Sequence, residues 1–232
     1  MPLFLQLNLR HGGSRRVVAI ADRLAEYRPD VVVLTEFRAN SHGEVLLRRL
    51  AGAGLIHHRV APAGARTNAV AVVSRHPLSQ GRWFTELGPN QHRLLEVEVL
   101  GVTLLGLYMP MNYAKAPVFE FLIRRQVALG QLPALLLGDL NTGKRYVDEE
   151  GATFIVPHYL DRMDALGWVD LWRRFHGERR EYSWYSPKGN GFRIDHAFAS
   201  ASLAGRVVEA AYSHDEREAG LSDHSLLRVK LD

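Results

Sequence analysis

Residues 134–141 read Ala-Leu-Leu-Leu-Gly-Asp-Leu-Asn, a short apolar run that gives way to a polar island. The run is typical of a buried strand, and in extended chain residues i and i+2 project from the same face. The carboxylate of Asp139 and the amide of Asn141 would then point at one spot, where a carboxylate can accept a proton from water and an amide can hold a phosphate oxygen. Gly-Asp-x-Asn also makes a good turn on its own. The stretch by itself therefore leaves a structural and a catalytic interpretation open.

Polar islands of the same chemistry occur elsewhere in the chain. Asn8 and Glu36 each follow an apolar, β-branched run, and Asp195 and the pair Asp223-His224 adjoin apolar runs near the C-terminus. Carboxylates, amides and one histidine, delivered at strand ends by distant segments, are the groups that a metal-assisted phosphoester hydrolase needs. The islands together favour a catalytic site.

Two of these islands carry the sharper hypotheses. An acidic residue such as Glu36 at the open end of a buried strand suits an oxygen-only Mg²⁺ site, although a surface or helix-capping glutamate would look the same. Adjacent residues in extended chain point opposite ways, so Asp223 could reach a metal while His224 turns to substrate. A histidine that faces a phosphate needs a carboxylate on its other nitrogen, and Asp195 is the candidate.

The hydrophobic periodicity predicts alternating strands and helices. Helices are expected at 16–27, 43–51, 118–129 and 158–166, and strands at 3–8, 31–34, 55–60, 69–74, 94–99, 102–108, 134–137, 194–199, 207–212 and 226–231. We find no repeat, low-complexity tract or linker. The pattern indicates one α/β domain over residues 1–232, with two packed sheets flanked by helices.

The composition bounds the class of protein. The chain has 232 residues, 47% hydrophobic and 23% charged, which is typical of a globular protein with a large core. It has no cysteine, which excludes disulfides, thiolate metal sites and a cysteine nucleophile. We expect no membrane segment, no signal peptide and a cytoplasmic location. The formal charge of +4 favours an anionic partner, although many arginine-rich proteins carry such a charge for solubility alone.

The segment 173–193 mixes cations with aromatic residues. It contains Arg173, Arg174, Arg179, Arg180, Lys188 and Arg193, interleaved with Phe175, Tyr182, Trp184, Tyr185 and Phe192. Cations neutralise phosphates, and aromatic rings stack on bases or pack against a sugar. The alternative is that the aromatics belong to the core and the arginines form a solvated face.

Six motifs in order carry a family resemblance. They are Asn8-Leu9-Arg10, Val33-Leu34-Thr35-Glu36, Leu107-Tyr108-Met109-Pro110, Gly138-Asp139-Leu140-Asn141, Arg193-Ile194-Asp195 and Ser222-Asp223-His224. Together they resemble the endonuclease/exonuclease/phosphatase superfamily over essentially the whole chain. The order and spacing within 166–195 resemble the exonuclease III branch, which acts on DNA as a 3′ exonuclease and at abasic sites.

The resemblance implies a four-layered α-β-β-α sandwich of two mixed β-sheets flanked by helices. It implies that Glu36 binds Mg²⁺ or Mn²⁺ with help from Asn8 and Asp223, and that Asp139 orients or deprotonates the attacking water. Asn141 and Tyr108 would hold the phosphate, and His224, braced by Asp195, would stabilise the developing charge. The residues expected to contact substrate are Asn112, Trp184, Arg193, Arg173 and Arg174.

The sequence departs from the DNA-repair branch at three places. Phe37-Arg38 follows Glu36 where that branch usually has Thr-Lys, the opening Asn8 lacks a following Asn or Asp with Gly, and Met111 separates the Tyr-x-Pro element from Asn112. These departures bear on abasic-site specificity more than on hydrolysis.

The function that we expect is a Mg²⁺-dependent nuclease whose partner is DNA, with no protein partner implied. A second hypothesis is a phosphatase or phosphodiesterase that acts on a small-molecule or lipid phosphate, since the same site serves those branches. A third is a catalytically silent binding module that keeps the fold.

Overall fold

Thirteen strands, most of them rich in valine and leucine, form three sheets in the computed structural model, which describes all 232 residues. The strands are β1 (Leu3–Asn8), β2 (Val31–Phe37), β3 (His57–Val60), β4 (Ala69–Ser74), β5 (Leu94–Val99), β6 (Val102–Tyr108), β7 (Ala134–Asp139), β8 (Val169–Asp170), β9 (Trp184–Tyr185), β10 (Gly191–Phe192), β11 (Asp195–Ala199), β12 (Val207–Ser213) and β13 (Leu226–Leu231). A six-stranded sheet has the order β12-β13-β1-β2-β4-β3, a five-stranded sheet has the order β5-β6-β7-β11-β8, and β9 and β10 form a separate hairpin.

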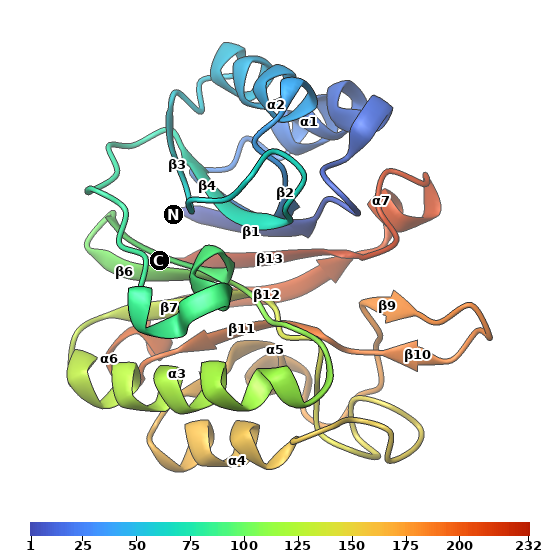
Figure 1. Cartoon of the computed structure of the whole chain (residues 1–232). Coiled ribbons are helices and arrows are strands. Elements are labelled where there is room, and N and C mark those ends of the chain that lie inside the picture. Colours follow the sequence, from blue (N-terminus) through green and yellow to red (C-terminus); the bar gives the residue numbers. More distant parts are fainter.

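Seven α-helices occur between the strands along the chain. They are α1 (Val17–Glu26), α2 (Ser41–Gly52), α3 (Lys115–Leu129), α4 (His158–Ala165), α5 (Leu171–His176), α6 (Ala201–Ala204) and α7 (Asp215–Glu218), with 3₁₀ segments η1 (Ser14–Arg16), η2 (Thr85–Arg93) and η3 (Asn112–Ala114). The side chain of Asn40 caps α2 by accepting hydrogen bonds from the backbone N–H groups of His42 and Gly43. Figure 1 shows α1 and α2 above the first sheet and α3 and α4 below the second, so the molecule has four layers. None of the helices is long and apolar enough to cross a membrane.

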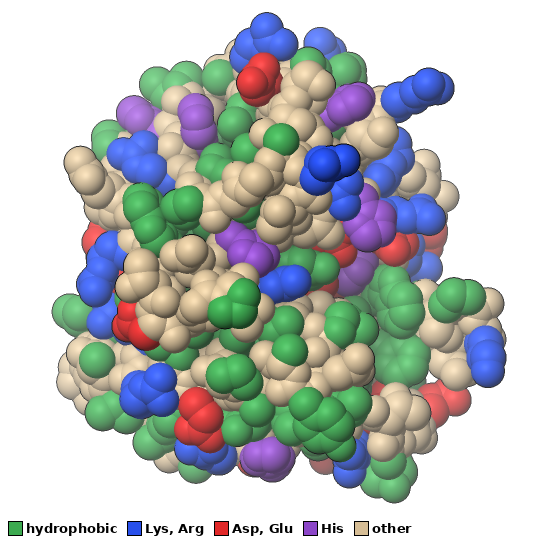
Figure 2. Space-filling model, in the orientation of Figure 1, with side chains coloured by type: hydrophobic (Ala, Val, Ile, Leu, Met, Phe, Trp, Pro, Cys, Tyr) green, Lys and Arg blue, Asp and Glu red, His purple; other side chains and the backbone are tan.

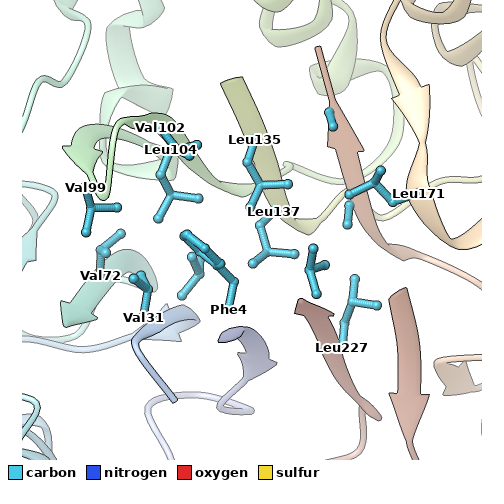
Figure 3. Packing of buried hydrophobic residues seen from close by; sticks show 14 of the residues in the cluster. Phe4, Val31, Val72, Val99, Val102, Leu104, Leu135, Leu137, Leu171 and Leu227 are labelled. Atoms are coloured by element: carbon cyan, nitrogen blue, oxygen red, sulfur yellow. The ribbon is translucent and has the colours of Figure 1, made fainter. Parts of the chain in front are cut away.

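Alternation along each strand fills the spaces between the layers. Val31 and Val33 pack in the cluster between the two sheets, whereas Val32 and Leu34 pack toward α1 and α2. Strands buried on both faces read as continuous apolar runs, which is the pattern of 31–34. Figure 3 shows Phe4 at the centre of the layer between the sheets, with Leu104, Leu135 and Leu137 facing it from the other side.

The two sheets approach each other closely at Gly106 on β6. A Cβ built there would lie 2.8 Å from Cγ1 of Val70 and 3.1 Å from Cγ1 of Val33, which belong to the opposite sheet. Side chains in a packed core leave no room for such an addition. Gly106 therefore fixes the spacing of the sheets.

The strand pairing brings the polar islands to one end of the molecule. β1 and β2 are parallel, as are β6 and β7, and all other pairs are antiparallel, so both sheets are mixed. In the register of the second sheet Asp139 pairs with Tyr108 on one side and with Asp195 on the other. The four layers and the two mixed sheets confirm the predicted fold class.

The predicted elements match the structure best where alternation is regular. The strands 3–8, 69–74, 94–99, 102–108 and 226–231 have the predicted bounds. β2 runs on through Phe37 and β7 through Asp139, and α3 begins three residues early at Lys115 because Pro117 is tolerated in the first turn of a helix. The short elements α5, α6, α7, β9 and β10 were not predicted, since two to six residues carry too little periodicity.

Candidate active site

A cavity of about 320 Å³ opens at the end of the two sheets where the polar islands meet. Its polar lining comprises Glu36, Tyr108, Asn112, Lys115, Asp139, Asn141, Thr153, Asp223 and His224. Eight of the residues predicted for the site line it: Glu36, Tyr108, Asn112, Asp139, Asn141, Trp184, Asp223 and His224. They come from strands and loops up to almost 190 residues apart, which agrees with the expectation that distant segments converge.

Asp139 ends β7 and is 1% exposed. Its Oδ2 accepts a hydrogen bond from Asn8 Nδ2 at 3.0 Å, and its Oδ1 accepts one from the backbone N–H of Asn141 at 2.8 Å. Burial and the neighbouring carboxylate of Asp195 raise the pKa of Asp139. A carboxyl group with a raised pKa at the floor of a cavity has the chemistry of a proton acceptor that works near neutral pH.

His224 and Asp195 form a buried pair beside Asp139. Nδ1–H of His224 donates to Oδ2 of Asp195 at 2.8 Å, and Gln6 Nε2 donates to the other oxygen of Asp195 at 3.0 Å. Burial disfavours charge on His224, but the carboxylate of Asp195 outweighs it and raises the pKa of His224 to about 10. The imidazole, whose Nδ1 is engaged by Asp195, is therefore a cation at neutral pH on the wall of the cavity.

Glu36 occupies a break in the β2 ladder. Its φ is 55°, and the pairing of β2 with β4 shifts between Leu34 and Phe37, so a bulge turns the carboxylate into the cavity. Tyr108 OH donates to its Oε1 at 3.2 Å, and Asn68 Nδ2 donates to its Oε2 at 2.9 Å. Burial, together with Glu36 and Asp139, raises the pKa of Tyr108 to about 12, so the phenol stays a neutral donor.

Asn8 links the two carboxylates of the cavity. Its amide nitrogen lies 3.0 Å from Oδ2 of Asp139 and 3.4 Å from Oε1 of Glu36, while its oxygen accepts from the backbone N–H of Arg10 at 2.8 Å. Asn8 was expected to help bind a metal. The structure gives it hydrogen bonds that position Glu36 and Asp139, and its role in metal binding stays a prediction.

The cavity has the donor set of a cation site. Oδ1 of Asp223 is buried and has no hydrogen-bond partner, and a buried carboxylate oxygen without a donor is the kind of atom that an ion or water satisfies. Ligand atoms of Asp139, Asp195 and His224 also lie within 4.8 Å of one another, although His224 and Asp195 already satisfy each other. Carboxylate oxygens suit a hard divalent cation.

The sequence predicted that Asp139 and Asn141 face the same spot because the chain is extended between them, and that reason was wrong. Asn141 has a φ of 49°, so the chain turns after Asp139 and does not continue as extended strand. Its Nδ2 donates to the carbonyl of Met109 at 2.8 Å. Asp139 and Asn141 share the cavity because of this turn, which combines the turn and site interpretations left open by the sequence. Asn112 also has a left-handed φ, of 54°, and lines the mouth.

One wall of the cavity is apolar. It includes Met111, Phe154, Ile155, Trp184, Phe192 and Ile194. Trp184 on β9 lies 5.8 Å from the ring of Phe192 on β10 and 6.4 Å from the imidazole of His224, measured between ring centroids. In Figure 2 the hairpin stands out from the body of the molecule, and hydrophobic side chains lie in the hollow between the two.

The three arginines expected to contact substrate lie outside the cavity. Arg193 is 0% exposed, and its guanidinium bonds to Asp148 at 2.6 Å and to Asp170 at 2.6 Å. Arg173 also bonds to Asp148, and Arg174 donates to the carbonyl of Ala204. Burial opposes charge on the carboxylates of Asp148 and Asp170, but the guanidinium of Arg193 outweighs this effect and lowers the pKa of both. The expectation of direct substrate contact was therefore wrong for Arg193, which is structural, and it does not fit the positions of Arg173 and Arg174.

Three residues that border the site were missed from the sequence. Lys115 is buried, lines the cavity and donates to the backbone carbonyl of Asn141. Asn68 and His11 both contact Oε2 of Glu36. Lys115 lies at a helix start and the other two in loops, where periodicity carries no information. The proximity of Lys115 and His11 to polar islands was the only available signal.

Comparisons with known proteins agree with the observed fold. The model of the endonuclease/exonuclease/phosphatase family matches residues 5–224. An AP endonuclease from Archaeoglobus fulgidus is similar in structure with a TM-score of 0.81 and 20% identity over 100% of both chains. The 3′ phosphatase NExo from Neisseria, bound to a product DNA hairpin, has a TM-score of 0.85 and 22% identity over 100% of both chains. The 3′-5′ exonuclease NExo from Neisseria meningitidis has a TM-score of 0.84 and 22% identity over 99% of both chains. No curated protein sequence matches the chain.

Proposed function

Because the chain belongs to the endonuclease/exonuclease/phosphatase family of hydrolases, we propose that it is a divalent-metal-dependent nuclease that hydrolyses phosphodiester bonds of DNA. The observation that carries the proposal is the buried constellation of Asp139, Asp195 and His224, of which Asp139 and His224 line a cavity that also has apolar lining residues and Asp195 lies behind His224. A water acceptor and a cationic imidazole face the same space, which is the requirement for attack on a phosphate.

Each polar residue has a role in this proposal. Asp139 accepts the proton of the attacking water, and Asn8 and the backbone N–H of Asn141 hold its carboxylate in place. The imidazolium of His224 donates to an oxygen of the phosphate as negative charge develops there, and Asp195 keeps the ring charged and oriented. The amide of Asn141 is a further donor beside the phosphate, and Tyr108 OH, which donates to Oε1 of Glu36, would become one if that oxygen bound a metal ion.

The metal requirement is assigned to Glu36 and Asp223. Mg²⁺ or Mn²⁺ held there, with the amide of Asn8 aligning Glu36, would supply a Lewis acid for the phosphoryl oxygen. The unpartnered Oδ1 of Asp223 supports this assignment.

DNA is favoured over a small phosphoester by the walls of the cavity. Trp184 and Phe192 provide a surface on which a base or a deoxyribose can pack. Tyr113 and Tyr185, which are exposed, directly follow the lining residues Asn112 and Trp184 in the chain. Three proteins with the same fold are described as an AP endonuclease, a 3′ phosphatase with product DNA and a 3′-5′ exonuclease. A phosphatase or phosphodiesterase acting on a small or lipid phosphate is the competing function.

The test is digestion of 5′-labelled duplex DNA in Mg²⁺ or Mn²⁺, using an intact duplex, one abasic site and a 3′-phosphate end in separate reactions. We expect stepwise shortening from the 3′ end or a single cut at the lesion, and no reaction in EDTA. Asp139→Asn and His224→Ala should each reduce turnover by about 10²–10⁴-fold. Asp161→Asn and His58→Ala, which change exposed residues of the same types, should leave it unchanged.

Three outcomes would contradict the proposal. Intact DNA, together with hydrolysis of a generic phosphoester by the same preparation, would establish the small-phosphate function. Metal-independent DNA binding without hydrolysis of any phosphoester would establish a silent binding module. Substantial activity in Asp139→Asn or His224→Ala would contradict the roles proposed for these two residues in the reaction.

A further inference from the structure

The loop between β1 and η1 has an unusual backbone. Five consecutive residues have left-handed φ values: Arg10 at 50°, His11 at 59°, Gly12 at 79°, Gly13 at 73° and Ser14 at 47°. Non-glycine residues adopt this conformation rarely and at a cost of order 1 kcal/mol or more each, and such residues concentrate at functional sites. In this chain the run turns His11 back toward the carboxylate of Glu36.

His11 approaches Glu36 with two nitrogen atoms. Its backbone N–H donates to Oε2 of Glu36 at 2.6 Å, and Nδ1 of its ring lies 3.2 Å from the same oxygen. The His11 ring is 69% exposed, whereas the Glu36 side chain is 13% exposed. The imidazole therefore sits at the open side of a nearly buried carboxylate.

Asn68 and Arg38 complete this cluster. Asn68 Nδ2 donates to Oε2 of Glu36 at 2.9 Å and lies 3.4 Å from Nδ1 of His11. Arg38 Nε donates to the oxygen of Asn68 at 2.6 Å, and its Nη2 lies 3.4 Å from Nδ1 of His11. Arg38 thus orients the amide that holds Glu36. The two contacts to the ring nitrogen are long for hydrogen bonds, so neither fixes Nδ1 strongly.

Resting on the proposed metal-dependent function, we propose that His11 is a ligand of the ion bound at Glu36 and makes this site prefer Mn²⁺ over Mg²⁺. Two ligands about 2.1 Å from one ion and at right angles lie roughly 3 Å apart, which is close to the observed separation of Nδ1 and Oε2. Imidazole nitrogen suits transition ions, whereas Mg²⁺ favours oxygen and water. Binding of the ion replaces the long contacts of Nδ1 with Asn68 and Arg38 and the hydrogen bond from Asn68 Nδ2 to Oε2 of Glu36. The backbone N–H of His11 stays on Oε2, and the bond between Arg38 and Asn68 is kept.

The experiment measures ion binding directly. Mn²⁺ is titrated into the whole chain while free Mn²⁺ is followed by electron paramagnetic resonance, and Mg²⁺ affinity is obtained by competition. Electron spin echo modulation of bound Mn²⁺ then reports a coordinated ¹⁴N. We expect ¹⁴N modulation in the wild type, its loss in His11→Ala, and at least about a tenfold weaker affinity for Mn²⁺ with less than about a threefold change for Mg²⁺.

Two further variants make the result specific. His58→Ala, which removes an exposed histidine on β3, should leave the modulation and both affinities unchanged. His11→Gln offers an oxygen in place of the ring nitrogen, so it should keep Mg²⁺ affinity and lose the modulation. Near-wild-type thermal midpoints for both His11 variants would show that neither result comes from unfolding.

The failures are separable. The role of His11 would be overturned if wild-type Mn²⁺ binding gave no ¹⁴N modulation, or if His11→Ala left the modulation and the ion preference unchanged. Either result would leave the proposed nuclease function standing, provided that the protein hydrolyses DNA. Absence of DNA hydrolysis in either ion would overturn the proposed function, and absence of ion binding to the wild type would overturn both.

Discussion

Asp195 acts on the cavity through its neighbours. It is 0% exposed, its two oxygens are satisfied by His224 and Gln6, and it does not line the cavity. Its effect on the reaction passes through the charge and orientation of the His224 imidazole and through the raised pKa of Asp139, which makes it a positioning residue.

Replacing Asp195 by Asn tests this role. We expect Asp195→Asn to lower turnover by about 10²–10⁴-fold and to lower the pKa of His224 from its value of about 10. Wild-type His224 stays protonated from pH 6 to 9, whereas the variant loses the proton within this range. The residual activity of the variant should therefore fall as pH rises, and ¹H–¹⁵N spectra of the ring should show the titration. An unchanged titration of His224 would contradict this explanation.

Lys115 gives a prediction about stability and pH. Burial lowers the pKa of Lys115 from 10.5 to about 8, so the folded protein binds fewer protons than the unfolded chain between about pH 8 and 10.5. The contribution of Lys115 to the free energy of unfolding therefore rises with pH over that interval. Below pH 8 the full cost of burying its ammonium group is present.

Lys115→Met should accordingly change stability differently at different pH. Relative to wild type, the free energy of unfolding of the variant should fall by about 1–2 kcal/mol between pH 7.5 and 10, less than the full shift gives because the cavity is open to water. Urea titrations at several pH values measure this difference. Lys188→Met, at an exposed position, should show no such trend. A difference that is constant with pH for Lys115→Met would contradict the burial of its charge.

At the scale of elements, Arg193 joins three segments behind the site. It precedes β11, and it holds Asp170 at the start of α5 and Asp148 in the loop that follows β7. The same network places the hairpin, because the backbone N–H groups of Ile194 and Asp195 both bond to Ser183 Oγ at 3.1 Å. An ion network thus connects the apolar wall to the catalytic floor.

Arg193→Met should destabilise the fold. Removing the cation takes from the buried Asp170 its arginine partner and leaves Asp148 with Arg173 alone, which costs about 3–5 kcal/mol. Guanidinium unfolding followed by circular dichroism measures the loss, and the exposed Arg179→Met serves as the control. A stable Arg193→Met protein with only a raised KM for DNA would instead restore the substrate-contact role that was first expected of this residue.

For the whole molecule, the net charge of +4 adds a general attraction for a polyanion. On the face shown in Figure 2, lysine and arginine side chains are accompanied by acidic ones.

A salt titration distinguishes DNA from a small substrate at this scale. If the protein neutralises about four phosphates, a fourfold rise in salt should weaken DNA binding by about 10²-fold. KM for a small phosphodiester such as bis-p-nitrophenyl phosphate should change little over the same range. Equal salt dependence for both substrates would indicate that DNA is not held beyond the reacting phosphate.

The sequence by itself determined the strands, the layers and most of the polar residues of the site. Residues 31–34 and 134–137 are apolar throughout because both faces of these strands are covered, and that property is local and readable. Glu36, Asp139, Asp223 and His224 interrupt or adjoin such runs, so their chemistry was visible without coordinates.

Only the tertiary structure decided which polar groups meet. The register of β7 and β11 sets Asp139 opposite Asp195. Left-handed backbone conformations orient the side chains of Glu36, Asn141 and His11 at the site. Arg193, expected to contact DNA, is instead a buried structural cation. These outcomes depend on pairing and packing between segments tens to more than a hundred residues apart. Periodicity reports the environment of each segment, but not its partner, and for that reason the partners could not be predicted from the chain alone.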